Sequence, residues 1–108
     1  MSPRPSLLEV RRRGAVVTLV GEVDLNTCDL LRSELALACA SDSGSGSGDV
    51  VIDFSGLTFI GSSGLRVLIE AAESLGERRL VLVGGGWAVY VVNLLGLTTR
   101  FPNIVVEQ

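Results

Sequence analysis

Apolar and polar positions follow two different spacings along the chain, which predicts strands and helices in alternation. The short runs rich in valine, leucine and isoleucine predict strands at 7–10, 15–23, 50–55, 79–83 and 104–106. The segments whose apolar residues recur every three or four positions predict helices at 27–40, 63–75 and 87–95. Asn26 is the expected N-cap of the first helix, and Arg11-Arg12-Arg13-Gly14 is the expected turn of a hairpin between the first two strands.

This order of elements predicts a single α/β domain with a mostly parallel, mixed β-sheet and helices packed on it. Right-handed crossovers place every strand-to-helix connection at the carboxyl ends of the strands, and therefore on one rim of the sheet. The connections expected there are 22–26, 56–62 and 84–86. We therefore expect the functional residues on this rim.

Length and composition agree with one folded domain. The 108 residues are the size of an ordinary domain, and a hydrophobic content of 47% is sufficient for a packed core. The domain is expected over residues 7–108, with a flexible N-terminus at 1–6. The serine- and glycine-rich residues 41–48 are expected to be a flexible insertion, because such a sequence cannot bury apolar surface.

The charged residues argue against several classes of function. The net charge is −3 and the basic residues are not concentrated, so nucleic acid is not an expected partner. The chain has no histidine, which excludes His-based acid–base catalysis and the metal sites that need imidazole. We therefore expect neither a metal nor a cofactor.

The compartment follows from the N-terminus and the cysteines. The sequence MSPRPSLLEV lacks the apolar stretch of a signal peptide, which predicts a cytoplasmic protein. Cys28 and Cys39 lie on one face of the first predicted helix but about 16 Å apart along its axis, so they cannot form a disulfide with each other. Reduced thiols are the expected state, and an intermolecular redox switch is the alternative.

Residues 80–99 carry no charge and are long enough to span a bilayer. The glycines at 84–86 and Asn93 interrupt this segment, and the part before the glycines resembles a buried strand. A strand, a turn and an apolar helix are therefore expected here rather than a membrane span.

Two adjacent serines, Ser62 and Ser63, follow Gly61 at the expected start of the second helix. In the simplest interpretation one of them only caps the helix. A nucleophilic serine in a strand-to-helix turn requires the spacing G-x-S-x-G and a base, and neither is present. A phosphate-binding loop requires a lysine after its glycines, which residues 61–64 and 84–86 do not supply. The protein is therefore not expected to be an enzyme.

Three segments resemble parts of the STAS domain, the fold of bacterial anti-sigma factor antagonists. Residues 50–65, VVIDFSGLTFIGSSGL, are similar to the signature of that family. Residues 21–27, GEVDLNT, are similar to its G-E-x-D-x-x-T stretch before the first helix. Residues 94–97, LLGL, followed by Phe101, resemble its helix end and final strand. These segments occur in the right order and span most of residues 7–106.

The resemblance implies a switch based on phosphorylation. In the family, the serine directly after the strand-to-helix turn is phosphorylated by an ATP-dependent anti-sigma factor kinase, and the unphosphorylated form captures that kinase and releases the sigma factor. The phosphorylated serine corresponds to Ser62, and the acidic residue that contacts the partner corresponds to Asp24, whose alternative role is a turn or capping carboxylate. The expected partner-binding residues are Asp24, Asn26, Gly61, Ser62 and Ser63. Gly61 stands where many members have an acidic residue.

The resemblance thus favours an anti-sigma factor antagonist that binds an anti-sigma factor kinase, is switched off by serine phosphorylation and regulates transcription. The alternative is a STAS subunit of a lipid-transport or transporter complex, in which the domain is a docking module. A scaffold in a larger signalling assembly is a third interpretation. The apolar residues of 87–97 leave almost no polar face on the last helix, which predicts weak self-association through it unless neighbouring loops cover it.

Overall fold

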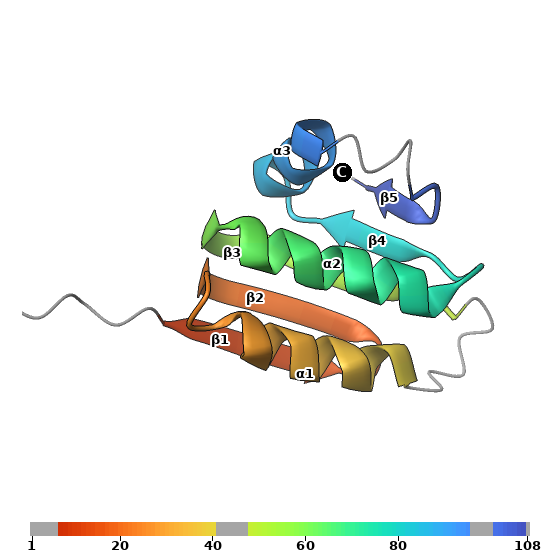
Figure 1. The fold of residues 1–108 in the computed structure, drawn as a ribbon, viewed down its shortest axis with the longest axis horizontal. Coiled ribbons are helices and arrows are strands. Elements are labelled where there is room, and N and C mark those ends of the chain that lie inside the picture. Colours follow the sequence, from red (N-terminus) through yellow and green to blue (C-terminus); the bar gives the residue numbers. More distant parts are fainter. Residues whose placement is uncertain (1–6, 41–47, 96–100, 108) are drawn as a thin grey trace, which may run out of the picture.

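The computed structural model describes residues 7–40, 48–95 and 101–107, which form a five-stranded sheet and three helices (Figure 1). The elements are β1 (Leu8–Arg13), β2 (Val16–Val23), α1 (Cys28–Ala40), β3 (Val50–Ile60), α2 (Ser62–Leu75), β4 (Leu80–Val83), α3 (Gly86–Leu95) and β5 (Ile104–Val106). The predicted α/β class is confirmed, and only β1 and β3 differ from the predicted bounds by more than one residue. The predicted flexible segments, 1–6 and all of 41–48 except its last residue, lie outside the described residues.

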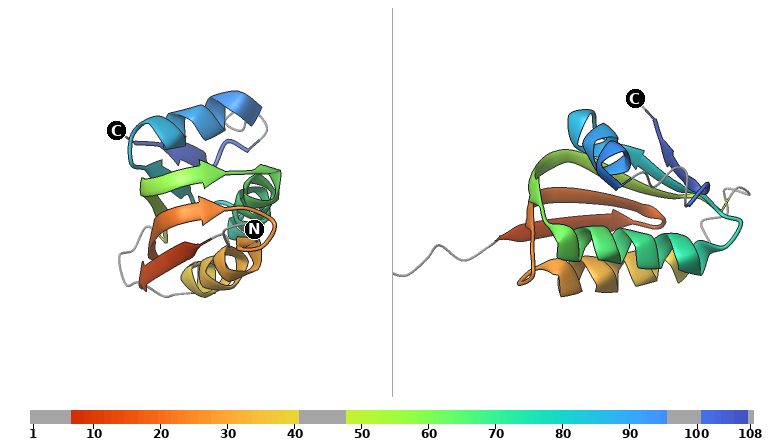
Figure 2. Two further views of the ribbon diagram at one scale, coloured as in Figure 1. Left: turned by 90° about the vertical axis from the view of Figure 1, so that its left-hand side faces the viewer. Right: turned by 45° about the horizontal axis from the view of Figure 1, so that its top comes forward.

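The strands lie in the sheet in their order along the chain, β1-β2-β3-β4-β5. β1 is antiparallel to β2, and all the other neighbours are parallel, which confirms the predicted mixed and mostly parallel sheet. α1 and α2 lie side by side on one face of the sheet (Figure 2). Because β2, β3 and β4 are parallel, their carboxyl ends point the same way. β2 and β3 end side by side, with Val23 opposite Ile60, as expected, whereas β4 ends earlier, with Val83 opposite Asp53.

The core lies between the sheet and the helices. Alternate residues of β2 and β3 point toward the helices, and among them Leu19 and Phe54 are completely buried. The buried side chains that the helices contribute are Cys28, Leu31, Leu35, Ala38, Leu65, Val67, Leu68, Ala71, Ala72, Leu75, Ala88 and Val91. α3 packs against β3 and β5, so this core extends across the sheet from the first helix to the last.

The hairpin between β1 and β2 differs from the prediction. The residues Arg11–Arg13 belong to β1, where Arg13 pairs with Val16, and the turn consists of Gly14 and Ala15. Gly14 has φ +59°, a conformation that a tight two-residue hairpin turn requires and that favours glycine. The arginines fit into the strand because β1 is an edge strand on which their side chains stay exposed to water.

β3 is longer than predicted. The segment 56–62, which the sequence suggested to be a loop, continues the strand as far as Ile60 and pairs with β2 up to Val23. The pairing shifts register twice, and a Cβ at Gly56 would lie 2.9 Å from the carbonyl oxygen of Leu19. Gly56 therefore permits a close approach between the two strands, whereas in the sequence it resembles the start of a loop.

The uncharged segment 80–99 forms a strand, a glycine turn and a helix over its described part, as predicted. Gly84 and Gly85 have φ +107° and +77°, the left-handed region that favours glycine, and α3 begins at the next residue. In the described part of the chain, no helix is long and apolar enough to cross a membrane.

Both cysteines belong to α1 and are free thiols. Cys28 is the first residue of the helix and is buried, whereas Cys39 lies in the last turn and is half-buried. Their places at opposite ends of one helix confirm the prediction that they do not form a disulfide with each other.

Candidate functional site

The rim at the carboxyl ends of β2 and β3 carries the residues that the sequence predicts as the site. The β2–α1 connection, residues 24–27, and Gly61, the single residue between β3 and α2, lie next to each other there. The backbone N–H of Gly61 donates a hydrogen bond of 2.8 Å to the carbonyl of Val23, which directly precedes the connection. The structure thus brings together two halves of the site that are separated by 34 positions or more in the sequence.

Asp24 shapes the β2–α1 connection through its carboxylate. Its Oδ1 accepts hydrogen bonds from the backbone N–H groups of Asn26 at 2.9 Å and of Thr27 at 3.2 Å. The hydroxyl of Thr27 accepts a hydrogen bond of 2.9 Å from the N–H of Asp24 and donates one of 2.8 Å to the carbonyl of Glu22. The turn-forming role expected as the alternative for Asp24 is therefore present, while the side chain stays partly exposed on the rim.

Asn26 is not the N-cap of the first helix, so this prediction was wrong. α1 begins at Cys28 and Thr27 directly precedes it, while the carboxylate of Asp24 accepts the N–H groups of Asn26 and Thr27. An aspartate at this spacing bonds the backbone two and three residues further on, which moves the start of the helix beyond Asn26. Asn26 is exposed, so it is available to a partner.

Gly61 and Gly64 set the position of the start of α2. Gly61 is the N-cap with an extended backbone, φ −98° and ψ −177°, and no side chain caps this helix. A Cβ at Gly61 would lie 3.3 Å from the ring of Phe59, so an acidic residue here needs only a small shift of that ring. A Cβ at Gly64 would lie 2.5 Å from Val23 Cγ1, which means that only glycine lets α2 approach the ends of β2 and β3 this closely.

Ser62 and Ser63 are the first two residues of α2, and neither caps it. Ser62 is exposed and Ser63 is half-buried, and neither hydroxyl has a hydrogen-bond partner among the described residues. The interpretation that one of them only caps the helix is therefore wrong, because Gly61 occupies the N-cap position. Both serines line a hollow of about 400 Å³ between α1 and α2, together with Leu25, Cys28, Asp29, Arg32 and Arg66.

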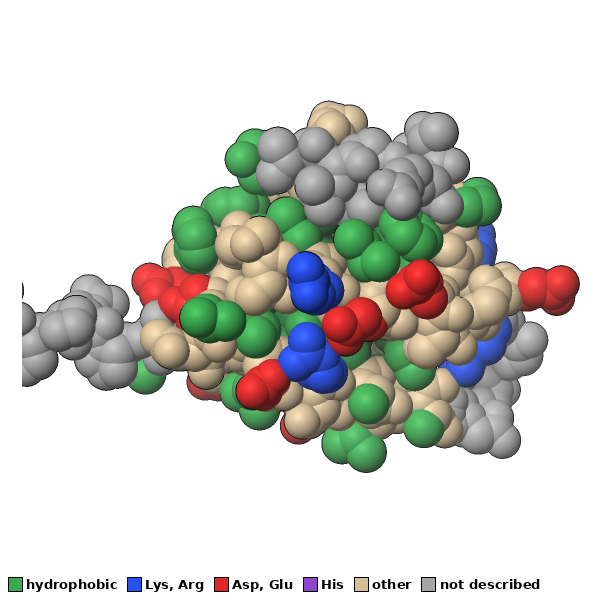
Figure 3. Space-filling model, in the orientation of Figure 1, with side chains coloured by type: hydrophobic (Ala, Val, Ile, Leu, Met, Phe, Trp, Pro, Cys, Tyr) green, Lys and Arg blue, Asp and Glu red, His purple; other side chains and the backbone are tan. Residues whose placement is uncertain are grey.

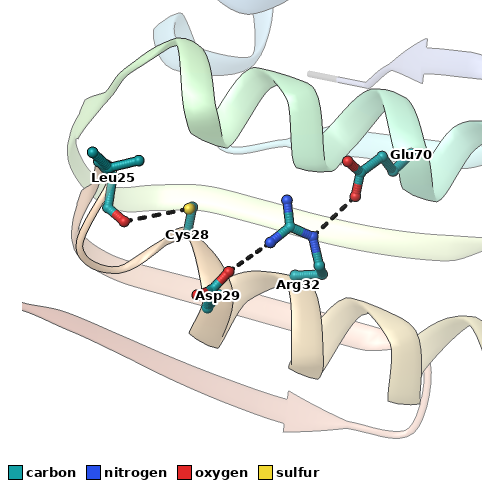
Figure 4. Close-up of polar contacts among 5 residues, drawn as sticks. All are labelled: Leu25, Cys28, Asp29, Arg32 and Glu70. Carbon is teal, nitrogen blue, oxygen red and sulfur yellow. Dashed lines mark hydrogen bonds and ion pairs between the residues drawn. The ribbon is translucent and has the colours of Figure 1, made fainter.

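Charged side chains of both signs lie on the face formed by α1 and α2 (Figure 3). Arg32 of α1 bonds Asp29 through Nη1 at 2.6 Å and Glu70 of α2 through Nε at 3.0 Å (Figure 4). The hydrogen bond to Glu70 raises the pKa of Arg32 above its ordinary value. Arg66, one turn after Ser62, is exposed and has no ion-pair partner in the part of the chain that the structure describes. Within that part, no group of three His, Cys, Asp or Glu residues is placed to hold a metal ion.

A second, apolar hollow lies where α3 begins, and the sequence did not predict it. Its volume is about 340 Å³, and its lining includes Phe54, Gly84, Trp87 and Tyr90. The rings of Trp87 and Tyr90 meet edge to face with centroids 5.6 Å apart, and Tyr90 is 52% exposed. Tyr90 agrees with the expectation of an outward-facing apolar residue on 87–97, but the part of that segment after Leu95 lies outside the described residues.

Leu25 and Phe59 are two further exposed apolar side chains that the sequence analysis did not select, with exposed fractions of 81% and 48%. Leu25 lies between Asp24 and Asn26, and Phe59 is next but one to Gly61. An apolar residue among the polar residues of a connection was the signal available for Leu25. Phe59 had no such signal, because it was assigned to a predicted loop.

A comparison with family models identifies residues 7–104 as a STAS domain, and the chain belongs to this family. The match extends from the start of the described chain to the first residue of β5, so it covers β1 to β4 and both halves of the site.

Solved structures with the same fold include anti-sigma factor antagonists. The crystal structure of an anti-sigma factor antagonist from Mycobacterium paratuberculosis has a TM-score of 0.70 and 28% identity, over 99% of this chain and 90% of that one. SpoIIAA in its unphosphorylated form has a TM-score of 0.64 and 18% identity, over 94% of this chain and 89% of that one. The phosphorylated form of SpoIIAA, a Bacillus cell fate determinant, has a TM-score of 0.60 and 18% identity, over 94% and 92%. None of the curated protein sequences compared with the chain matches it. The chain has the fold of a non-enzymatic regulator and resembles anti-sigma factor antagonists.

Proposed function

We propose that the protein is a cytoplasmic anti-sigma factor antagonist that captures an anti-sigma factor with serine kinase activity and is switched off when that kinase phosphorylates Ser62. The observation that carries this proposal is the state of the Ser62 hydroxyl. It is exposed at the first position of α2, on the rim, and none of the described residues bonds it. A protein kinase supplies its own base and metal ions, so its substrate needs only an accessible and well-positioned hydroxyl.

The location of Ser62 suits a switch that leaves the domain folded. A phosphate adds about −1.5 to −2 charges and three acceptor oxygens. At the start of α2, the helix dipole and the unpaired backbone N–H groups favour negative charge. The phosphate therefore reduces the free energy of binding to the partner, because the partner's surface contacts a bulky dianion in place of a small hydroxyl. A loss of about 3 kcal/mol there corresponds to roughly a hundredfold weaker binding.

The surface around Ser62 supplies the other contacts of the proposed interface. Asp24 and Asn26 come from the β2–α1 connection, and Gly61 and Ser63 flank the phosphorylated position. Exposed Leu25 lies among them and offers an apolar contact beside these polar groups. Such a mixture of a central apolar group and surrounding polar groups is typical of protein interfaces.

The comparisons support this proposal in two ways. The antagonist from Mycobacterium paratuberculosis covers nearly the entire chain at 28% identity. SpoIIAA has been solved in an unphosphorylated and in a phosphorylated form, and both have the fold described above. The same fold therefore accommodates a phosphorylated state in a related protein.

The test uses two matched serine variants. The candidate kinases are captured from a lysate of the source organism with the unphosphorylated protein, identified by mass spectrometry and incubated with it and ATP. We expect phosphate on the wild type and on Ser63→Ala, and none on Ser62→Ala, which should still bind the kinase. Phosphate on Ser63 alone, or on neither serine, contradicts the proposal.

The apolar hollow beside Trp87 and Tyr90 favours one alternative function, a docking subunit of a lipid-transport or transporter complex. Such a subunit needs an apolar contact surface for a membrane-protein partner, and this hollow lies away from the serines. In the same capture experiment, recovery of a transporter permease, unaffected by Ser62→Ala and lost with Tyr90→Arg, favours this alternative.

A further inference from the structure

Arg66 lies one helical turn after Ser62 on the same side of α2. Residues four positions apart on a helix are neighbours on its surface, and these two side chains line the same hollow between α1 and α2. Arg66 is exposed, and no described residue forms an ion pair or side-chain hydrogen bond with it. A guanidinium without a partner therefore stands beside the hydroxyl that the proposed function assigns to phosphorylation.

The other charged groups around the hollow already form ion pairs with one another. Asp29 and Arg32 come from α1 and Glu70 comes from α2, one turn beyond Arg66. Arg32 bonds both carboxylates, at 2.6 Å and 3.0 Å, so it is held between them (Figure 4). The thiol of Cys28, which also lines the hollow, donates to the carbonyl of Leu25 at 3.5 Å. Among the cations of this hollow, Arg66 is thus the one that can accept an anion without breaking an existing ion pair.

We propose that Arg66 is the internal partner of the phosphate on Ser62, an inference that rests on the proposed function. In the transfer, the Ser62 Oγ forms a bond to the γ-phosphorus of a nucleoside triphosphate bound by the kinase. The bond from that phosphorus to the bridging oxygen breaks, the nucleoside diphosphate leaves, and the hydroxyl proton passes to the base of the kinase. The resulting phosphate dianion then accepts two parallel hydrogen bonds from the guanidinium of Arg66.

This pairing changes the surface in two ways at once. The partner loses access to the Ser62 hydroxyl, and it also loses the positive charge of Arg66, which the phosphate neutralises. The pair holds the phosphate against α2, where the first N–H groups of the helix also favour an anion. Arg66 is therefore a positioning residue for the phosphorylated state, and the start of α2 does not have to unfold to accommodate the phosphate.

The experiment is independent of the kinase, because phosphoserine is incorporated at position 62 by amber suppression. The second pKa of the phosphate, near 6 in a free phosphoserine, is measured by ³¹P NMR titration. Ion pairing with Arg66 lowers this pKa, and we expect Arg66→Gln to raise it by about 0.5 pH unit. The control is Arg13→Gln, which removes an exposed arginine at the opposite end of the sheet and should leave the pKa unchanged. Amide spectra establish that each variant is folded, and Arg66→Lys, which keeps the charge without the planar fork, should give an intermediate value.

Equal pKa values in the parent protein and in Arg66→Gln overturn the inference. A pKa that rises in Arg32→Gln but not in Arg66→Gln also overturns it, because Arg32 is then the partner. If the phosphoserine protein shows the Arg66-dependent shift but the captured kinase leaves Ser62 unmodified, the proposed function fails and the pairing remains. The two failures are thereby distinguishable.

Discussion

The missing side chain at Gly64 lets α2 pack closely against the ends of β2 and β3, and replacing this glycine with alanine tests how Ser62 is positioned. The Cβ of Gly64→Ala would lie 2.5 Å from Val23 Cγ1 and 2.8 Å from Ile60 Cγ1, both on side chains that are themselves buried. Overpacking of this kind costs about 1–3 kcal/mol, and contacts this short belong at the upper end of that range. Alanine in place of glycine within a helix recovers about 1 kcal/mol. The expected net effect is a loss of about 1–2 kcal/mol in the free energy of unfolding.

The assay is equilibrium unfolding in urea, with Gly86→Ala as the matched control. A Cβ at Gly86, the first residue of α3, meets nothing within 4 Å, so this variant should be as stable as the parent protein or slightly more stable. Because Gly64→Ala pushes the start of α2 away from β2 and β3, it should also weaken binding of the kinase. If Gly64→Ala is as stable as Gly86→Ala, the argument that close packing at Gly64 positions α2 is refuted.

Three further predictions concern other parts of the molecule. Asp24→Asn keeps an acceptor oxygen for the backbone but removes the charge, so the free energy of unfolding should change by less than about 0.5 kcal/mol while the affinity for the kinase falls. Asp24→Ala should weaken kinase binding as well and also lose about 1 kcal/mol of stability. Intact binding in both variants would leave Asp24 with a turn-forming role only. A hydrogen bond from Arg79, with Nη2 2.7 Å from Oδ2, lowers the pKa of Asp49, so this pair stabilises the fold above about pH 3.9 and ceases to do so as the pH falls through the lowered value. Asp49→Asn should therefore reduce the melting temperature at pH 7, and this reduction should shrink as the pH falls below about 3.9; a reduction that stays the same throughout the acid range would contradict this. Sedimentation should show self-association through the exposed face of α3 at protein concentrations on the order of tens of micromolar, and Tyr90→Arg should abolish it. A parent protein that stays monomeric at millimolar concentration would contradict this prediction.

Local patterns were sufficient to predict most of the fold. The valine-rich strands and the helical spacing of leucines place six of the eight elements within one residue of their observed bounds. The two exceptions depend on contacts that are distant in sequence. β3 continues past Gly56 because β2 lies beside it, and β1 includes Arg11–Arg13 because an edge strand leaves charged side chains in water.

The candidate site was predictable as a set of residues but not as a geometry. The sequence selected Asp24 and Ser62 and left a turn-forming role for Asp24 open. It did not show that α1 begins beyond Asn26, or that neither serine hydroxyl is bonded by a described residue. The sequence also did not predict the ion pair between Arg32 and Glu70, because these residues belong to different helices and lie 38 positions apart. Such features depend on how α1 and α2 pack, which no local pattern encodes.

The backbone bond between Gly61 and Val23 has a consequence for how such switches diversify. The place of the Ser62 hydroxyl depends on this bond and on a glycine at 64, and so on no exposed side chain. Exposed neighbours such as Leu25 and Asn26 are therefore free to change in a duplicated gene without moving the hydroxyl. Under the proposed function, related proteins in one cell can thus acquire separate kinases by surface substitutions alone. Such substitutions would limit cross-talk between their pathways while the Ser62 oxygen keeps its position.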